Sequence, residues 1–265
     1  MTQEILMVIP TLGRRNALLR GAMSSIRSQG LQVDIVVVAP DLPGVRQVID
    51  EFGGRFVVDP ARGGQSGALN AGLEAALPSA KYFAWLCDDD LLNPGALRAA
   101  KEALDRRPDA SMVYGWCDYI DESGTVLFSS RAGRLAAWIQ PWGPNLVPQP
   151  GSLMRLRSVR EVGGIDESCR LAMDLDLFLR LRKAGPVLSL PQTLAQFRWH
   201  GDSLTVANEA ASMDEADSIR QRHLSSLGAV AYPIVRRPSR WALRLAKRRV
   251  QARSNRRAAV HQGHP

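Results

Sequence analysis

Short apolar runs alternate with longer Ala- and Leu-rich segments through the first 110 residues, and this alternation restricts the possible folds more than any other feature. The run Asp34–Ala39 (DIVVVA) is rich in β-branched residues, which is typical of a parallel strand buried on both faces. Strands and helices that alternate in this way form a mostly parallel sheet with helices on both faces. The predicted strands are Ile5–Pro10, Asp34–Ala39, Arg55–Val58 and Tyr82–Cys87, and the predicted helices are Asn16–Gln29, Val45–Phe52, Gln65–Leu77 and Pro94–Arg107.

The regular alternation ends after Pro108. The Trp- and Pro-rich segment Leu135–Gln149 is long enough to predict a functional loop or lid. We expect one α/β domain over residues 1–230, with halves at about 1–110 and 111–230, followed by a basic tail at 231–265. The strands predicted in the second half are Ser111–Cys117, Thr125–Phe128, Gly151–Leu156 and Thr193–His200, and the helices are Asp174–Ala184 and Asn208–Leu227.

The positive charge of the chain is concentrated at its C-terminal end. The formal net charge is +8, yet Arg236–Pro265 holds ten Lys and Arg residues and no Asp or Glu, which leaves 24 basic and 26 acidic side chains before it. Trp241 and Leu245 lie one helical turn apart among these cations. The pattern fits either an amphipathic helix on an anionic membrane surface or a solvated tail without fixed structure. A near-neutral body without a recognised nucleic-acid module argues against nucleic acid as a partner.

Cysteine spacing and the N-terminal sequence favour a cytoplasmic protein. Cys87, Cys117 and Cys169 lack the CxxC spacing of zinc sites and do not form a disulfide framework. The start MTQEILMVIP has no basic segment ahead of an apolar core, unlike a secretory signal. The longest uncharged stretch, Leu135–Met154, contains four prolines, which argues against a membrane span.

Three consecutive aspartates, Asp88, Asp89 and Asp90, follow directly on the predicted strand Tyr82–Cys87. Adjacent carboxylates repel one another, so this arrangement is destabilising unless a cation or another ligand offsets the charge. The carboxyl ends of strands in an open α/β sheet bind ligands, and a hard divalent cation between carboxylates and phosphates fits there. The alternative is an acidic cap on the helix that Pro94 begins.

Two segments rich in small residues stand where strands give way to helices. The turn at Pro10 and Thr11 can hold a nucleotide. The segment Gly63–Gly72 (GGQSGALNAG) lets a helix approach a diphosphate or the sheet closely, although it lacks the lysine of a P-loop. Close packing against the sheet explains these glycines equally well.

The second half adds two further candidates. Asp174 opens a predicted helix, where it can act as a general base toward an acceptor hydroxyl or as a simple N-cap. Asp176 and Arg180 stand four residues apart, which predicts a surface ion pair. His200 ends a strand before a glycine turn and can serve as a structural residue or as a ligand to a metal at the aspartates.

An ordered set of motifs gives the sequence a specific resemblance. The motifs are VIPTLGRRNALL, GGQSGALNAGLEAA, WLCDDDLLNPGAL, GSLMRLRSVREVGGIDES and AMDLDLFLRL followed by FRWHGDS. Over roughly residues 5–205 the chain resembles the family 2 glycosyltransferases, which have the GT-A fold. The resemblance implies transfer of a sugar from a nucleoside diphosphate sugar to an acceptor hydroxyl, with inversion at the anomeric carbon. It also implies a divalent cation, Mn²⁺ or Mg²⁺, that neutralises the diphosphate.

The resemblance implies roles for individual residues. Asp174 aligns with the catalytic base, and Asp89 with the main metal-binding carboxylate. The implied nucleotide-sugar residues are Pro10, Thr11, Arg14, Asp41, Gln65, Asn70, Asp88 and Asp89, the implied metal ligands are Asp89, Asp90 and His200, and the implied acceptor region includes Trp142, Gln149 and Ser152. The first half of the chain would then hold the nucleotide sugar, and the second half the acceptor. That acceptor would be a polysaccharide, a glycolipid or a glycosylated metabolite, and the basic tail would bring the enzyme to a lipid-linked one.

Three positions depart from the family pattern. After the second predicted strand, where the family commonly has aspartates, the chain has Ala39, Pro40 and Asp41. Cys87 occupies the position that the first aspartate of the metal motif usually holds. Met173 replaces the acidic residue that usually precedes the base. These changes bear on the residue roles more than on the fold.

Two other classes of function remain open at this point. A sugar nucleotidyltransferase would also place aspartates and a cation at a sheet edge, although Arg14 and Arg15 supply only part of its basic N-terminal loop. A non-catalytic module that targets anionic surfaces would depend on Arg236–Pro265 and not on Asp89.

Overall fold

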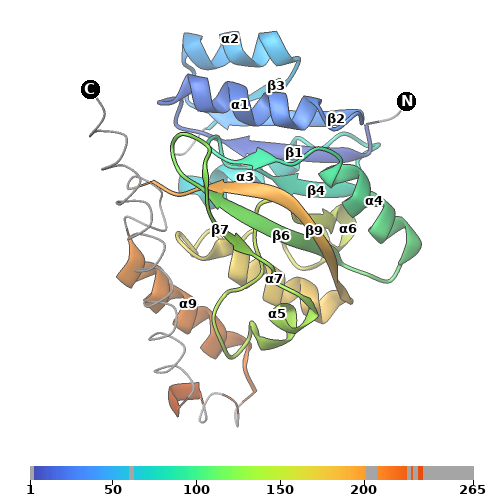
Figure 1. Cartoon of the computed structure of the whole chain (residues 1–265), viewed down its shortest axis with the longest axis vertical. Coiled ribbons are helices and arrows are strands. Elements are labelled where there is room, and N and C mark those ends of the chain that lie inside the picture. Colours follow the sequence, from blue (N-terminus) through green and yellow to red (C-terminus); the bar gives the residue numbers. More distant parts are fainter. Residues whose placement is uncertain (1–2, 60–62, 201–207, 226–227, 229–231, 235–265) are drawn as a thin grey trace.

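The computed structural model describes residues 3–59, 63–200, 208–225, 228 and 232–234, and within them one sheet runs through both halves of the chain (Figure 1). Its strands lie in the order β3-β2-β1-β4-β8-β6-β9-β5, and β7 pairs with β6 outside this path. The strands are β1 (Ile5–Pro10), β2 (Val33–Ala39), β3 (Arg55–Val58), β4 (Tyr82–Trp85), β5 (Leu91–Leu92), β6 (Met112–Ile120), β7 (Val126–Ser130), β8 (Leu153–Arg155) and β9 (Val187–Arg198).

The long ladders of this sheet are parallel. Strands β3, β2, β1 and β4 are all parallel neighbours, and β6 runs parallel to β9 over its full length. The short strand β8 joins the two groups by antiparallel pairing with β4 and β6. The expected α/β class with a mostly parallel sheet is therefore confirmed. Because β1 and β4 are parallel, their carboxyl ends meet at the same edge.

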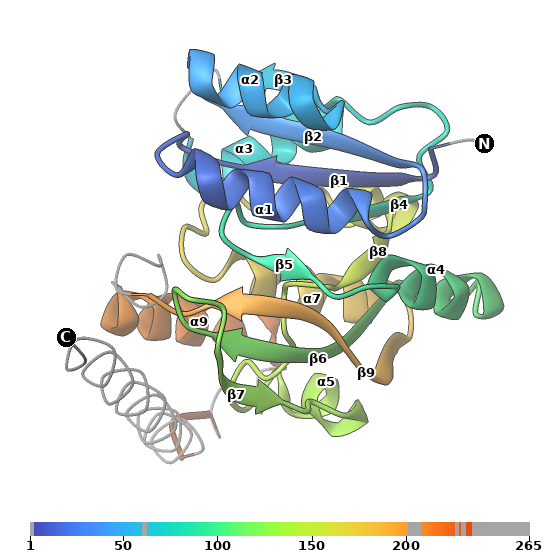
Figure 2. The same cartoon turned by 45° about the horizontal axis from the view of Figure 1, so that its top comes forward.

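Alternating side chains on β1 point into two separate cores. Ile5, Met7 and Ile9 pack under α1 (Asn16–Arg27), whereas Leu6 and Val8 pack under α3 (Gly64–Glu74). Figure 2 shows α1 in front of the β1–β2 pair and α3 behind it. The first core also includes α2 (Pro43–Phe52) and α4 (Ala96–Arg106), and the second includes α5 (Arg134–Ile139), α6 (Leu156–Glu161), α7 (Met173–Ala184) and α9 (Glu209–His223).

The small residues of α3 let this helix lie directly on the sheet. A Cβ atom at Gly72 would lie only 2.5 Å from Cγ1 of Val8 on β1. The packing explanation therefore holds for Gly72, since any side chain there would push α3 away from the sheet. The position of α3 in turn places Gln65, in its first turn, beside Cys87.

The structure also corrects the sequence-based prediction at several elements. The segment Leu135–Gln149 is not a loop throughout, because α5 covers Arg134–Ile139. Arg182 of α7 donates hydrogen bonds to the carbonyls of Ala137 and Trp138, which would otherwise lack partners at the end of α5. Helix α6 and the two-residue strand β5 were also not predicted, and β9 begins at Val187, before the predicted Thr193. Short elements of this kind are stabilised by tertiary contacts, which local sequence patterns do not show.

Candidate active site

The aspartates lie at the carboxyl edge of the sheet, where the turn after β1 meets the turn after β4. The hydroxyl of Thr11 donates a hydrogen bond to Oδ2 of Asp88, and Oγ1 of Thr11 accepts one from the N–H of Gly13 at 3.0 Å. The N–H of Thr11 in turn donates to the carbonyl of Val38 on β2 at 3.0 Å. Burial raises the pKa of Asp88, an effect that the Thr11 hydrogen bond opposes and the Asp89 charge reinforces.

Asp89 is held by a histidine and an arginine from distant parts of the chain. Nε2 of His200 lies 2.7 Å from Oδ2 of Asp89 and 2.8 Å from Nη1 of Arg15. The same Arg15 nitrogen lies 3.7 Å from Oδ2 of Asp89. The structure thus brings His200 to the aspartates, as the sequence predicts. It adds Arg15, which stands at the start of α1 one residue after the predicted Arg14.

Asp90 points inward and is fully buried. Its Oδ1 accepts a hydrogen bond from the N–H of Arg198 at 2.9 Å, and its Oδ2 has no hydrogen-bond partner among the described residues. Burial, together with the charge of Asp89, raises the pKa of Asp90 well above its ordinary value. The guanidinium of Arg198 also holds the Asp88–Asp90 turn, since its Nε donates a hydrogen bond to the carbonyl of Asp89 at 3.1 Å.

The acidic turn has a donor set that fits a hard divalent cation. Ligand atoms of Cys87, Asp89 and Asp90 all lie within 4.8 Å of one another. Burial and the neighbouring carboxylates raise the pKa of the Cys87 thiol, which also accepts a hydrogen bond from Gln65 at 3.3 Å. Hard cations such as Mn²⁺ and Mg²⁺ prefer oxygen to sulfur ligands, so the oxygens of Asp89 and Asp90 are the suitable donors. The unpartnered Oδ2 of Asp90 is the observation that a bound cation would explain.

A second carboxylate, Asp174, stands in the first turn of α7. Its Oδ2 accepts a hydrogen bond from Nδ2 of Asn145 at 3.0 Å. Burial raises the pKa of Asp174, and the N–H of Leu175 and the Asn145 amide oppose this effect. Burial, together with the charges of Asp90 and Asp174 among others, also raises the pKa of Tyr119 on β6.

Asp176 is not part of a surface ion pair, contrary to the prediction from its spacing. The residue is 3% exposed, its Oδ2 accepts a hydrogen bond from Nε of Arg180 at 2.8 Å, and the same oxygen forms an ion pair with Nη2 of Arg180 at 2.6 Å. Its Oδ1 lies 2.9 Å from Nε2 of His223 on α9. Burial opposes ionisation, but the hydrogen bonds from His223 and Arg180 hold the pKa of Asp176 below its ordinary value. This carboxylate joins α7 to α9 and is already neutralised by protein cations, so we assign it no metal.

Several other predicted site residues make contacts that hold the framework of the site. Asn70 donates to the carbonyl of Ile165 at 2.9 Å and accepts from its N–H at 3.0 Å. Gln149 donates to the carbonyl of Trp85 at 2.8 Å, and Ser152 closes a turn by donating to the carbonyl of Pro148 at 2.7 Å. The Gln149 bond fastens the loop before β8 to the end of β4, and the Asn70 bonds fasten α3 to the segment after α6.

Three predicted residues remain accessible near the edge of the molecule. The exposed Asp41 pairs with Arg46 at 2.6 Å, and this hydrogen bond lowers the pKa of Asp41. Arg46 also lies over the ring of Phe56, 4.2 Å from its centre. Arg14 is exposed, as is Trp142, which keeps 37% of its surface accessible.

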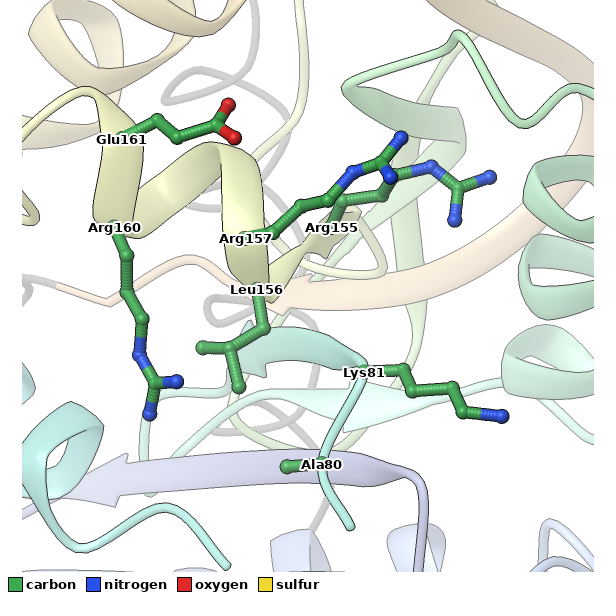
Figure 3. A pocket seen from close by; sticks show the side chains of 7 residues that line it. All are labelled: Ala80, Lys81, Arg155, Leu156, Arg157, Arg160 and Glu161. Carbon is green, nitrogen blue, oxygen red and sulfur yellow. The ribbon is translucent and has the colours of Figure 1, made fainter. Parts of the chain in front are cut away.

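A cavity of about 480 Å³ lies away from the acidic turn, at the opposite end of β4. Its lining includes Lys81, Arg155, Arg157 and Arg160, and Figure 3 shows that Arg160 extends away from the other cationic side chains. Arg155 donates to the carbonyls of Ala110 and Leu104 at 2.8 Å and 2.5 Å, which commits its guanidinium to the end of α4. These cationic side chains do not converge on one point, so we assign no ligand to this cavity.

Solved structures place this arrangement in a known class of fold. Mannosyltransferase PcManGT from Pyrobaculum calidifontis, in complex with GDP-Man and Mn²⁺, matches with a TM-score of 0.67 at 14% identity, covering 100% of this chain and 77% of that one. S. aureus TarS 1–349 in complex with UDP matches with a TM-score of 0.59 at 13% identity, covering 82% of this chain and 65% of that one. The fold is the GT-A fold of glycosyltransferases.

The family follows from the sequence match. Residues 7–160, more than half of the chain, match the model described as glycosyl transferase family 2. The chain belongs to this family, as its motifs predict.

Two curated relatives share part of their length with the chain. The uncharacterised protein y4gI of Sinorhizobium fredii is 31% identical over 191 residues, which is 66% of this chain and 20% of that protein. An uncharacterised glycosyltransferase of Rickettsia bellii is 21% identical over 206 residues, which is 74% of this chain and 30% of that protein. The chain thus spans between a fifth and a third of the length of these relatives.

Proposed function

We propose that this chain transfers a sugar from a nucleoside diphosphate sugar to the hydroxyl of a polysaccharide, glycolipid or glycosylated metabolite, with inversion at the anomeric carbon. The observation that carries the proposal is the presence of two carboxylate sites with different surroundings. The turn Asp88–Asp90 is bordered by Arg15 and His200, whereas Asp174 contacts a polar amide. An inverting transfer needs one site for the leaving diphosphate and another for the acceptor hydroxyl.

The donor side of the site would be built from the turns after β1 and β4. Asp89 and Asp90 would hold a divalent cation, which supplies neutralisation of the leaving diphosphate when bound. The guanidinium of Arg15 would add a fixed positive charge next to the same phosphates. Thr11 would keep Asp88 in place through its hydrogen bond. The family pattern assigns His200 to the metal or the diphosphate, and its 2.7 Å contact with Asp89 supports that role.

Asp174 would act as the general base on the acceptor side. Its raised pKa, caused by burial, brings the carboxyl closer to neutral pH and makes it a better proton acceptor once ionised. The base functions without an acidic neighbour, because Met173 precedes it. Trp142, Gln149 and Ser152 belong to the segment that follows α5, and this segment would shape the acceptor site.

Thermal unfolding in the presence of UDP-glucose or GDP-mannose, with Mn²⁺ or Mg²⁺, tests the donor site. A matching donor and cation should raise Tm by about 5 °C. The Asp89→Ala variant should lose this shift, whereas Asp174→Ala should keep the shift and lose transfer. Asp109→Ala is the control, since Asp109 is exposed and pairs only locally with Arg107. An unchanged shift in Asp89→Ala would contradict the proposed donor site.

The products separate this function from nucleotidyl transfer. A glycosyltransferase releases a nucleoside diphosphate, whereas a sugar nucleotidyltransferase exchanges pyrophosphate. The anomeric proton coupling of the product, measured by NMR, reports directly whether the configuration is inverted. Retention of configuration would contradict the role of Asp174, because a single displacement inverts the anomeric carbon.

Peripheral contact with an anionic membrane is part of the same proposal. The basic tail that suggests it lies outside the described residues, and none of the described helices is long and apolar enough to cross a membrane. On the described surface, α5 exposes Leu135 at 70% and Trp138 at 68%, with Arg131 and Arg134 also exposed beside them. Exposed Trp and Leu flanked by cations are typical of segments that rest at a lipid interface.

A further inference from the structure

A short chain of side-chain hydrogen bonds joins Asp174 to the loop after α5. Nδ2 of Asn145 donates to Oδ2 of Asp174 at 3.0 Å, and Nε2 of Gln140 donates to Oδ1 of Asn145 at 2.8 Å. Gln140 is 2% exposed, so its amide has little freedom to turn. Because the NH₂ group of Gln140 can only donate, it selects the oxygen of Asn145 and leaves the NH₂ group of Asn145 for the carboxylate.

Helix α9 holds Gln140 from the other side. Nε of Arg220 donates to the backbone carbonyl of Gln140 at 3.2 Å. Arg220 is 5% exposed and lies 3.5 Å from Asp217, which also accepts a hydrogen bond from the hydroxyl of Tyr232 at 2.6 Å. These buried contacts fix α9 against the loop that carries Asn145.

The same helix fixes the entry into α7. Oε1 of Glu215 accepts hydrogen bonds from the N–H groups of Arg170, Leu171 and Ala172, each at 2.9 Å. These three residues directly precede α7, so α9 supplies the acceptor for the backbone N–H groups that lead into this helix. The base candidate therefore stands between two segments that α9 holds in place.

We propose that Asn145 is a positioning residue that fixes the Asp174 carboxylate in one orientation and in its ionised form, and that Gln140 and α9 form the clamp that orients Asn145. The catalytic meaning of this inference rests on the proposed function, in which Asp174 is the base. The matched family model ends at residue 160, so α7, α9 and their contacts lie beyond it.

The electrostatic reason for a positioning residue is that burial of the Asp174 carboxylate opposes its ionisation. A general base must be ionised before it can accept a proton, and burial disfavours the charged form. The groups that favour the charged form are the N–H of Leu175, the Asn145 amide, the N–H of Asp174 itself and the positive charge of Arg220. The charge of Asp174 contributes to the raised pKa of Tyr119 on β6, and on α7 itself Asp176 is already paired with Arg180.

Titration of Asp174 in the chain of residues 1–265 tests the inference without any substrate. The chain is labelled with ¹³C at the aspartate carboxyls, and the Asp174 signal is assigned by its absence in Asp174→Asn. In Asn145→Leu, the titration midpoint of Asp174 should rise by about one pH unit, since one hydrogen bond to the carboxylate is lost. Asn145→Gln keeps an amide donor, so its Asp174 midpoint should lie between those of wild type and Asn145→Leu. Gln140→Leu should also raise the midpoint, but less than Asn145→Leu does.

Leu146→Ala serves as the control for disturbance of the loop. Leu146 is the next residue in the same loop and is 39% exposed, so its truncation should leave the Asp174 midpoint unchanged. If the midpoint also stays at the wild-type value in Asn145→Leu, the positioning role is overturned. If it moves in Asn145→Leu but not in Gln140→Leu, the clamp is overturned while the role of Asn145 stands.

Turnover of UDP-glucose or GDP-mannose, whichever stabilises the protein, separates this inference from the proposed function. The acid limb of kcat should move to higher pH in Asn145→Leu, while KM for the donor stays within about twofold. If Asp174→Asn turns over donor like the wild type, Asp174 is not the base. Asn145 then has no catalytic role through Asp174. If Asp174→Asn is inactive and the acid limb of Asn145→Leu is unmoved, only the inference fails.

Discussion

The acidic turn is held by single side chains that arrive from distant positions. Thr11 reaches Asp88 from the end of β1, Arg15 comes from the start of α1, and His200 follows β9. Charged and polar groups that converge on adjacent carboxylates reduce the repulsion between them. Each of these side chains therefore contributes to the site through one identifiable contact, and each contact can be removed by a single substitution.

Thr11→Val tests the contact with Asp88, because valine keeps the shape of threonine and lacks its hydroxyl. Loss of one hydrogen bond to a carboxylate should weaken donor binding in the presence of Mn²⁺ about tenfold. Calorimetric titration with the stabilising nucleotide sugar measures this change. Thr125→Val is the matched control, since Thr125 lies in the exposed β6–β7 turn, where its hydroxyl shares a hydrogen bond with the hydroxyl of Ser123 at 3.0 Å. Equal affinity in Thr11→Val and wild type would show that Thr11 is dispensable for the donor site.

At the scale of elements, α7 and α9 are joined by a buried carboxylate. Asp176 bonds Arg180 on its own helix and His223 on α9, and both partners hold its pKa below the ordinary value. A lowered folded-state pKa stabilises the fold above the unfolded pKa of about 4, and this contribution is lost as pH falls through the folded value.

Asp176→Asn should therefore destabilise the protein most at neutral pH. The substitution leaves Arg180 and His223 without their shared carboxylate, which should lower the free energy of unfolding by about 3 kcal/mol. The difference from wild type should shrink as the pH is lowered below about 4. Urea unfolding at a series of pH values measures both effects, with the exposed Asp109→Asn as the control. A difference that does not change with pH would argue against ionised Asp176 in the folded state.

Glu215→Ala tests how α9 supports the start of α7. The three N–H groups of residues 170–172 would lose their common acceptor, and the free energy of unfolding should fall by about 2 kcal/mol. Glu215→Gln keeps an acceptor oxygen and should lose less. Glu102→Ala on α4 is the control for removing a surface glutamate, because Glu102 makes only an exposed contact with Arg106 at 3.6 Å. Equal stability of Glu215→Ala and wild type would mean that water replaces the side chain without cost.

The same elements show what the sequence could predict and what it could not. Strands β1 and β2 were predictable because their apolar runs are buried on both faces, and β1 has the predicted bounds. The edge strand β3 also has the predicted bounds, although its residues are only half-buried or exposed. Helices α5 and α6 have six residues each, too few for a periodic pattern, and depend on contacts such as Arg182 with α5.

The residues of the candidate site also fall into those that the sequence could predict and those that it could not. Asp89, Asp174 and His200 could be selected because their residue types stand in recognisable motifs at the ends of strands or helices. Asn145 and Arg198 could not be selected in this way. Asn145 lies in a loop whose path depends on α5 and α9, and Arg198 acts through backbone carbonyls of Asp89 and Asp121, contacts that no motif records.

At the scale of the whole molecule, charge and apolar exposure are unevenly distributed. Residues 123–160 contain five arginines and no Asp or Glu, and the last thirty residues are more basic still. The exposed side chains Leu135 and Trp138 stand within the first of these segments. A molecule of this kind should meet an anionic bilayer through α5 and the tail together, with Leu135 and Trp138 at the interface and Arg131 and Arg134 near the headgroups.

Binding to vesicles tests this orientation. The chain of residues 1–265 should co-sediment with vesicles that contain about 30% phosphatidylserine and should remain in solution with neutral vesicles. The double variant Leu135→Ser with Trp138→Ser should bind anionic vesicles about tenfold more weakly, because two interfacial anchors are lost. Val58→Ser is the matched control, since Val58 is 48% exposed on β3 and lies far along the sheet from β6 and α5. Removal of Arg236–Pro265 should weaken binding independently of the double variant. If the double variant binds as tightly as wild type while the truncated chain does not bind, the tail alone makes the contact and α5 faces away from the membrane.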